Sequence, residues 1–365
     1  MNVLFVITKS ELGGAQTHVY QLSKYLRGKG HEVHITAFPG GWLHVQADKA
    51  GIPFHSNTAL SNSLNPLKGL SAARGVAALV RRIRPDVIHC HSSAAGFWTR
   101  IAIRNSVPTL YTAHGWGFTP GTPLLRGTVM LVVERIAARF TKAFICVSEF
   151  DRKLAIERGI NSAESITTIH NGIEVQKGEG SKSNRGPLKA VFVGRLSGQK
   201  EPELLIRALS ELPRHIRDLY ELQVIGEGPM LSDIRALVPE GITNIRIHGA
   251  IAREEVLRTL SESHLFILTS RYEGFPISIL EAMSMGLAVI ASDVGGIREA
   301  VTPECGILIG RGDKEALKRA LTRLAEDRAA IERYGAAARE RARTEFSVTA
   351  MCEKTLAVYD SIRAR

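Results

Sequence analysis

The sequence predicts an α/β protein with two doubly wound parallel-sheet domains that face each other across a cleft. Short apolar runs with the length of buried strands alternate with stretches of helical periodicity along the chain. The 365 residues are too many for a single ordinary core. A polar, glycine-rich stretch at 174–187 interrupts the alternation and is typical of a linker. We therefore expect one domain at 1–173, a second at 188–346, and a final segment at 347–365.

The composition is typical of a globular chain in a reducing compartment. Hydrophobic residues make up 44% of the chain, and no apolar run reaches the roughly 18 to 20 residues that a membrane span needs. The apolar run at 2–7 is short and is ended by Lys9, which favours a first strand over a signal peptide. The four cysteines are scattered and form no Cys-x-x-Cys pair. This pattern indicates a cytoplasmic protein without a zinc site or a disulfide scaffold.

The net charge of +11 is concentrated in the first half of the chain. Residues 1–170 hold 19 basic and 9 acidic side chains, whereas residues 171–365 hold 28 and 27. This asymmetry suggests an anionic partner for the first half, although basic residues also simply keep a protein soluble. No helix-turn-helix, zinc or aromatic RNA-binding signature is present, so we do not expect a nucleic-acid partner. An anionic membrane surface is the favoured partner.

The chain opens with a strand at 2–7, a glycine loop, a helix at 17–26 and a strand at 33–37. This order resembles a dinucleotide-binding fold, but the Gly-x-Gly-x-x-Gly fingerprint is absent. Gly13 and Gly14 instead allow the backbone after the first strand to pass close to a ligand. Two glycines alone indicate this only weakly.

Two further strands of the first domain end at histidines. The strand at 87–91 ends at His91, and the strand at 109–113 is followed by His114. Ligands of open α/β sheets gather at the carboxyl ends of the strands, so both residues are candidates. A surface turn is the alternative for His114, and a core position is the more natural interpretation of His89.

Residues 116–126 form an aromatic loop rich in glycine and proline, followed by an apolar helix with basic flanks. Exposed Trp116 and Phe118 beside Arg126 would suit docking at a membrane interface or binding of a lipid-linked acceptor. Packing of both aromatic rings in the core is the alternative.

The second domain opens with a strand at 188–193, followed by Arg195 and Lys200. Two cations between a strand and a helix can bracket a diphosphate, although a surface basic pair is the plainer interpretation. A later strand at 222–225 is followed by Gly226 and Gly228, which indicate a tight turn.

A strand–loop–helix–strand unit lies at 265–291. Its loop carries Glu273, Pro276 suits the first turn of the helix, and Glu281 lies about a turn and a half into that helix. A helix N-terminus beside glycine can hold phosphate, and a carboxylate further in can accept hydrogen bonds from ribose hydroxyls. The alternative is that Glu273 only caps the helix and Glu281 is solvated.

The stretch EGFPISILEAMSMGLAVIASDVGGIRE at 273–299 resembles the donor-sugar motif of the family 4 retaining glycosyltransferases, which have the two-domain GT-B architecture. The two acids, the Gly-Phe-Pro turn and the later Gly-Gly pair all match. The resemblance implies that Glu273 contacts the transferred sugar and Glu281 the ribose. It further implies that the backbone after Glu273 approaches the sugar and diphosphate, at Gly274, Phe275, Pro276 and Ile277.

The same resemblance extends to other candidates. Thr-x-His-Gly at 112–115 is similar to the position of a histidine that contacts the donor sugar, so it implies a positioning role for His114. The Gly13–Gly14 loop then reaches toward the diphosphate and acceptor, and the loop at 226–228 lines the nucleotide pocket. The segment at 347–365 would cross back to the first domain.

The family also places an arginine and a lysine on the donor diphosphate with the spacing of Arg195 and Lys200. A glycine is usual after that lysine, whereas this chain has Glu201. The departure would either change the local geometry or partly neutralise Lys200.

The resemblance thus implies a retaining, metal-independent glycosyltransferase with no cofactor beside its nucleotide-sugar co-substrate. It would move a hexose or N-acetylhexosamine, with a UDP donor favoured, to a glycan acceptor of exopolysaccharide, capsule or O-antigen synthesis. The basic first half and the loop at Trp116–Arg126 favour a polyprenyl-diphosphate-linked acceptor at the inner membrane surface. A non-catalytic sugar-nucleotide or glycan-binding protein and a GT-B nucleotide-sugar epimerase are the alternatives.

Overall fold

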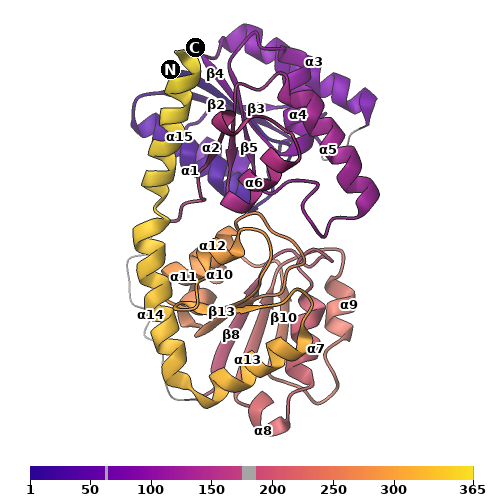
Figure 1. The fold of residues 1–365 in the computed structure, drawn as a ribbon, viewed down its shortest axis with the longest axis vertical. Coiled ribbons are helices and arrows are strands. Elements are labelled where there is room, and N and C mark those ends of the chain that lie inside the picture. Colours follow the sequence, from indigo (N-terminus) through magenta and orange to yellow (C-terminus); the bar gives the residue numbers. More distant parts are fainter. Residues whose placement is uncertain (62–64, 175–185, 365) are drawn as a thin grey trace. The chain divides into compact units, whose positions relative to one another are not determined.

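The computed structural model describes residues 1–61, 65–174 and 186–364, and the chain divides into two compact units (Figure 1). The N-terminal unit comprises Met1–Gly172 together with Val348–Arg365, and the C-terminal unit comprises Ile173–Ser347. The predicted linker at 174–187 lies almost wholly outside the described residues.

The N-terminal unit is built on a parallel sheet of order β3-β2-β1-β4-β5-β6-β7. Its strands are β1 (Asn2–Val6), β2 (Glu32–Ala37), β3 (Phe54–Ser56), β4 (Val87–His91), β5 (Thr109–Ala113), β6 (Ala143–Cys146) and β7 (Ile166–Thr168). Its helices are α1 (Gly14–Gly28), α2 (Trp42–Lys49), α3 (Pro66–Ile83), α4 (Ser93–Ile103), α5 (Leu124–Ala138), α6 (Glu149–Glu157), the 3₁₀ turn η1 (Ala163–Ser165) and α15 (Val348–Arg363).

Side chains of β1 alternate between two cores, one on each face of this sheet. Leu4 and Val6 pack with residues of α3, α4, α5 and α6, whereas Val3 and Phe5 pack with residues of α1, α2 and α15. Because successive side chains of a strand point to opposite faces, a strand buried on both sides must be apolar throughout. This requirement is why the central strands read as unbroken apolar runs.

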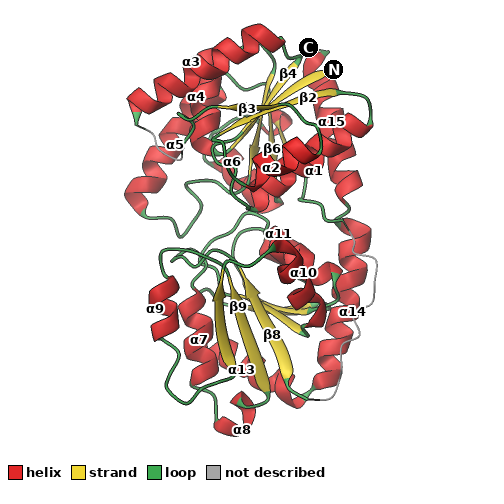
Figure 2. Cartoon of the chain, turned by 180° about the vertical axis from the view of Figure 1, so that it is seen from behind, coloured by secondary structure: helices red, strands yellow, loops and turns green. Residues whose placement is uncertain are grey.

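The C-terminal unit has a parallel sheet of order β10-β9-β8-β11-β12-β13 (Figure 2). Its strands are β8 (Leu188–Val193), β9 (Tyr220–Ile225), β10 (Ile245–Gly249), β11 (Leu265–Leu268), β12 (Ala288–Ser292) and β13 (Gly306–Ile309). Its helices are α7 (Pro202–Ser210), α8 (Arg214–Arg217), α9 (Leu231–Ala236), α10 (Arg253–Glu262), α11 (Ile277–Ser284), α12 (Ile297–Ala300), α13 (Lys314–Glu326) and α14 (Arg328–Glu345).

In each sheet the strand order reverses beside the first strand of the unit. β1 pairs with both β2 and β4, and β8 pairs with both β9 and β11. Such a reversal leaves a crevice at the carboxyl ends of the two central strands, because the connections on either side lead away from each other. The predicted fold class, two doubly wound parallel-sheet units, is confirmed.

Some element boundaries differ from the predicted ones. α1 begins at Gly14, so the glycine pair opens this helix instead of preceding it by a turn. Pro276 is the N-cap of α11 and lies just before the first turn. The charged segment after residue 313 forms two helices, because the side chain of Asp327 accepts a hydrogen bond from the backbone N–H of Ala330 and starts a second one.

The aromatic loop before α5 packs into the core, so the expectation of exposed aromatic rings is wrong. Trp116 and Phe118 are only 3% and 8% exposed and stack on each other at 5.2 Å between ring centroids. The indole N–H of Trp116 donates to the backbone carbonyl of Asp151 over 2.9 Å. A buried indole needs such a partner, which fixes the ring inside the unit. Within the described ranges, no helix has both the length and the apolar character to cross a membrane.

Candidate active site

In the C-terminal unit, Lys200 and Glu273 meet at the carboxyl ends of β8 and β11. The Lys200 ammonium donates to Oε1 of Glu273 over 2.5 Å, and the Ser270 hydroxyl donates to the same oxygen over 2.6 Å. Both charged side chains are largely buried. α11 receives no side-chain cap, so Glu273 does not serve as its N-cap. The structure therefore brings together a carboxylate and a cation that the sequence places 73 residues apart.

Hydrogen bonds to backbone carbonyls, two of them from side chains, join the loops that carry these two residues. The hydroxyl of Thr269 donates to the carbonyl of Glu201 over 2.9 Å, and the N–H of Arg271 donates to the carbonyl of Gln199 over 2.8 Å. The amide of Gln199 donates in turn to the carbonyl of Tyr272 over 3.1 Å. These hydrogen bonds hold the two loops against each other, and this arrangement keeps Lys200 beside Glu273.

Glu201 takes the left-handed backbone conformation that a glycine would adopt most easily, with φ of 48°. Its carboxylate accepts two hydrogen bonds from the guanidinium of Arg271, at 3.0 and 2.8 Å. The expectation that Glu201 would partly neutralise Lys200 is therefore wrong. Arg271 engages Glu201, and Lys200 keeps Glu273.

Glu281 is buried on α11, with 5% of its surface exposed. The guanidinium of Arg253, the first residue of α10, contacts both carboxylate oxygens of Glu281, one of them at 3.0 Å. The alternative of a solvated Glu281 is therefore wrong. Sequence reasoning missed Arg253, because a single arginine at a helix start carries no local signal for a partner 28 residues away.

Glycines bring the loops after β8 and β9 into close contact. Gly226 has a φ of 147°, and a Cβ there would lie 1.9 Å from the carbonyl oxygen of Gly194. A Cβ on Gly228 would lie 2.1 Å from the carbonyl oxygen of Leu196. Only glycine permits this approach. The turn at 226–228 thereby supports the backbone of Arg195, whose own side chain is exposed.

Gly295 supports the loop that carries Glu273 in the same way. A Cβ on Gly295, which has a φ of 57°, would lie 1.9 Å from the carbonyl oxygen of Glu273. The N–H of Gly296 donates to the carbonyl of Gly274 over 2.9 Å. Backbone packing beneath the loop thus requires glycine at position 295, while Gly296 contributes its N–H to the same loop.

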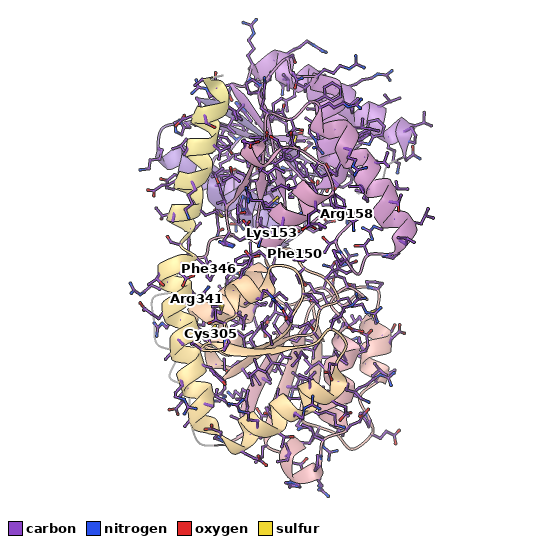
Figure 3. All side chains as sticks on the ribbon, viewed as in Figure 1. Phe150, Lys153, Arg158, Cys305, Arg341 and Phe346 are labelled. Carbon is purple, nitrogen blue, oxygen red and sulfur yellow. The ribbon has the colours of Figure 1, made fainter. Side chains whose placement is uncertain are left out.

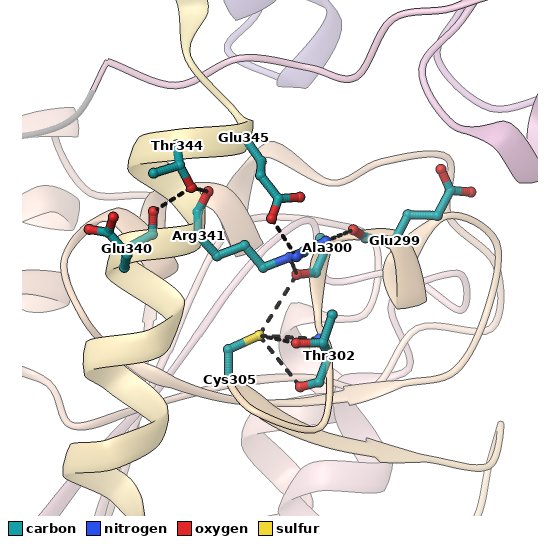
Figure 4. Close-up of polar contacts among 8 residues, drawn as sticks. All are labelled: Glu299, Ala300, Thr302, Cys305, Glu340, Arg341, Thr344 and Glu345. Carbon is teal, nitrogen blue, oxygen red and sulfur yellow. Dashed lines mark hydrogen bonds and ion pairs between the residues drawn. The ribbon is translucent and has the colours of Figure 1, made fainter.

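The end of α14 also holds this loop. Phe275 is buried and packs edge-on against Phe346, with ring centroids 5.3 Å apart. Arg341 lies over the Phe346 ring and donates to the carbonyls of Glu299 and Ala300, each over 3.0 Å (Figures 3 and 4). Pro276 and Ile277 are buried beside Phe275. The side chain of Phe275 therefore anchors the loop to the end of α14.

In the N-terminal unit, His114 and His91 meet at the ends of β5 and β4. Nε2 of His114 lies 3.0 Å from Nδ1 of His91. His18 of α1 packs edge-on against His114 at 5.0 Å between centroids, and its Nδ1 lies 3.0 Å from the side-chain oxygen of Asn171. His89 lies within the core, where it contacts the Tyr359 hydroxyl at 2.6 Å. Sequence reasoning missed His18, whose only signal is its place in the first turns of the helix after the glycine loop.

Burial lowers the pKa of each histidine in this cluster. The pKa of His18 falls to about 4, because desolvation outweighs its hydrogen bond with Asn171. Desolvation also lowers the pKa of His91 and His114 well below 6.5. These imidazoles are therefore neutral near pH 7, and each offers one donor and one acceptor, which suits uncharged hydroxyl groups.

The glycine loop of the N-terminal unit opens α1. Gly13 is the N-cap with extended backbone, and α1 has neither a side-chain cap nor an acid in its first turn. The first N–H groups of such a helix can bind an anion. Across the described parts of the chain, no group of three or more His, Cys, Asp or Glu side chains is arranged to hold a metal ion.

Two doubly wound parallel-sheet units in one chain are the architecture of the GT-B glycosyltransferases. The family models agree. The model "Glycosyltransferase Family 4" matches residues 12–177, and "Glycosyl transferases group 1" matches residues 176–341. The chain is 30% identical to the O-antigen biosynthesis glycosyltransferase WbnH of Escherichia coli, over 82% of this chain and 83% of that protein. The chain belongs to glycosyltransferase family 4 and is a glycosyltransferase.

A second Escherichia coli relative is named UDP-Gal:alpha-D-GlcNAc-diphosphoundecaprenol alpha-1,3-galactosyltransferase. It is 27% identical over 87% of this chain and 86% of its own. Among solved structures, HepE of Anabaena in complex with UDP-glucose has a TM-score of 0.83 at 21% identity, covering 99% of this chain and 100% of its own. That likeness shows the shared fold.

Proposed function

We propose that this glycosyltransferase transfers a hexose or N-acetylhexosamine from a UDP-sugar to a lipid-linked glycan, with retention of configuration and without a metal ion. The observation that carries the proposal is the Lys200–Glu273 pair at the strand ends of the C-terminal unit, with Arg195 on the adjoining loop. The Escherichia coli relative named for galactose transfer to GlcNAc-diphosphoundecaprenol supports the choice of donor and acceptor.

The donor would bind to the C-terminal unit through its phosphates and ribose. Lys200 has three N–H donors and uses one on Glu273, so it can still donate to a diphosphate oxygen. Arg195 would contact the same diphosphate, while the backbone at 274–277 would approach the sugar. Glu281, oriented by Arg253, would accept hydrogen bonds from the ribose hydroxyls.

Transfer forms a bond between the acceptor oxygen and the anomeric carbon and breaks the bond from that carbon to the β-phosphate oxygen. Negative charge develops on the departing diphosphate, where Lys200 and Arg195 stabilise it. In a same-face reaction the acceptor hydroxyl proton passes to the leaving phosphate oxygen, so no side chain is needed as a base. Neutral His114 would orient the sugar by hydrogen bonding.

The N-terminal unit would bind the acceptor. A polyprenyl-diphosphate carrier is both anionic and lipidic, which fits the positive charge of that unit. The reaction would then take place in the cytoplasm, at the inner face of the membrane.

The test is UDP release by the purified protein with a panel of UDP-sugars and synthetic lipid-diphosphate-linked sugars, with and without EDTA. We expect acceptor-dependent UDP release that EDTA leaves unchanged. Release that requires a divalent cation would overturn metal independence. Binding of UDP-sugar without turnover of any acceptor would favour a binding protein, and UDP release without any acceptor would favour an epimerase.

A further inference from the structure

We infer that the outer surface of α5 docks this protein on an anionic lipid bilayer. This α5 face consists of an apolar set and a basic set: Leu124, Leu125, Val129, Val132 and Ile136, with Arg126, Arg135 and Arg139. The functional role of the α5 face rests on the proposed lipid-linked acceptor. That the face is exposed, apolar and basic rests on the residues themselves.

The apolar part of the α5 face is strongly exposed. Leu124 and Leu125 are 87% and 81% exposed. Leu125, Val129, Val132 and Ile136 follow the i, i+4, i+7, i+11 spacing that places side chains on one stripe of a helix. Every large apolar side chain that is exposed in the described ranges lies in the N-terminal unit, and half of them lie on α5. A concentration of this kind marks an interaction surface.

The exposed charges of α5 and its C-cap residue Arg139 have one sign. The only acid of α5, Glu134, is fully buried and pairs with Arg100 of α4 over 2.7 Å. Arg126, Arg135 and Arg139 are exposed. Arg135 also donates to the carbonyl of Arg158, at the end of α6 (Figure 3). The surface of the helix is therefore apolar and cationic, the composition of a helix that lies in the interface of an anionic membrane.

The net charges of the two units agree with an anionic surface that contacts the N-terminal unit. In the full sequence, the N-terminal unit has 22 Lys+Arg against 11 Asp+Glu, and the C-terminal unit has 25 against 25. The same helical layer exposes Leu67 and Leu70 of α3, and α3, α4 and α5 lie side by side in Figures 1 and 2. The exposed apolar side chains and the excess of basic residues thus both lie in the N-terminal unit.

The charges favour a bilayer over a second copy of this chain. In a twofold contact the same face meets itself, so the arginines of both copies would come together, and α5 itself exposes no carboxylate to pair with them. Anionic headgroups offer the opposite charge, and acyl chains can take up the leucines.

The loop between His114 and α5 gives the docking surface a fixed relation to the candidate site. The buried rings of Trp116 and Phe118 anchor this loop. A Cβ on Gly117 would lie 2.9 Å from Met130, so the loop backbone packs directly on α5. A bilayer under α5 would therefore present its lipid-linked sugars to the unit that carries His114.

Flotation of the full-length protein with lipid vesicles tests this inference. One set of vesicles contains phosphatidylglycerol in phosphatidylethanolamine, and the other contains phosphatidylcholine alone. We expect the wild type to float with the first set, and binding to be at least about tenfold weaker in 0.5 M NaCl or in the Leu124→Ser/Leu125→Ser variant. Arg126→Glu/Arg139→Glu should lose binding to the same extent.

A matched pair of single variants controls for general loss of surface hydrophobicity. Val132 on α5 and Val45 on α2 are 50% and 47% exposed. Val132→Ser should weaken flotation, whereas Val45→Ser should leave it unchanged. Lys49→Glu, also on α2, is the corresponding control for charge. Circular dichroism of each variant verifies that it is folded.

Equal flotation of the α5 variants and the α2 controls would overturn the inference, as would a wild type that does not bind phosphatidylglycerol vesicles. Sedimentation velocity identifies the competing occupant. A wild-type dimer that Leu124→Ser/Leu125→Ser converts to a monomer, with flotation unchanged, would assign the face to a second copy. UDP binding, measured by calorimetry on the same samples, reports on the proposed function separately, so either idea can fail without the other.

Discussion

Lys200 donates a hydrogen bond of 2.5 Å to Glu273, although 73 residues separate them in the chain. The contact exists because β8 and β11 are neighbours in the sheet, with Leu265 opposite Ala190 and Phe266 opposite Val191. The loops that follow the two strands therefore emerge together. Under the proposed function, a lysine held in this way would already be oriented for the leaving phosphate before a donor binds, which is the preorganisation that electrostatic catalysis requires.

Removing the Lys200 ammonium should slow the chemical step more than donor binding. We expect Lys200→Ala to lower kcat about 100- to 1,000-fold, because stabilisation of the leaving diphosphate is greatest in the transition state. Steady-state UDP release measures the effect. Lys189→Ala, on the same strand, is the control and should keep wild-type rates. A Lys200→Ala enzyme with kcat within about threefold of wild type would contradict the role given to the pair.

Arg253 should act through Glu281, with donor affinity as the main readout. Arg253→Ala leaves the buried Glu281 carboxylate without its fork-shaped partner, so the carboxylate is no longer held for the ribose. We expect the KM for the UDP-sugar to rise about tenfold or more, with a smaller change in kcat. Arg253→Lys, which contributes one point charge in place of the fork, should restore only part of the affinity. A change confined to kcat would argue against this positioning role.

The left-handed backbone conformation of Glu201 should lower the stability of the folded protein. A non-glycine residue in the left-handed region costs about 1 kcal/mol. Glu201→Gly and Glu201→Ala both remove the pair with Arg271, which lies partly in solvent and contributes little. The glycine variant should therefore be more stable than the alanine variant by about 1 kcal/mol, measured by urea unfolding. Equal stability of the two variants would show that φ at this position carries no strain.

The buried histidines should make the protein less stable in mild acid. Desolvation lowers the pKa of His18 from 6.5 to about 4. Between these pH values His18 is therefore protonated in the unfolded chain and neutral in the folded chain. The free energy of unfolding should therefore fall as the pH decreases from about 6.5 toward 4. His18 alone corresponds to on the order of 3 kcal/mol over that range.

Urea unfolding at several pH values between 7.5 and 4.5 measures this dependence. Three other histidines act in the same direction, because burial also lowers the pKa of His89, His91 and His114. His18→Gln should reduce the slope of stability against pH by up to one proton. An unchanged slope in that variant would mean that His18 is protonated in the folded protein.

Much of the fold could be predicted from local patterns. A strand buried on both faces must be apolar throughout, and a helix must repeat its apolar positions, so both kinds of element are visible in a single sequence. The donor motif was equally visible, because Glu273, the Gly-Phe-Pro turn and the paired glycines lie within one short segment. The same patterns could not show whether Trp116 and Phe118 face water or the core, since both environments suit an aromatic loop.

The alternation of strands and helices, and the identity of the polar residues that end the strands of each unit, follow from the sequence. The partners of those residues follow from the folded chain: Glu273 for Lys200, Arg253 for Glu281, and Arg271 for Glu201. The folded chain also shows that Leu124 and Leu125 of α5 are exposed while the neighbouring aromatic rings are buried. This division arises because an apolar run indicates only how much surface an element can bury. Which charges meet depends on which strands become neighbours, and that order is fixed only when the whole sheet assembles.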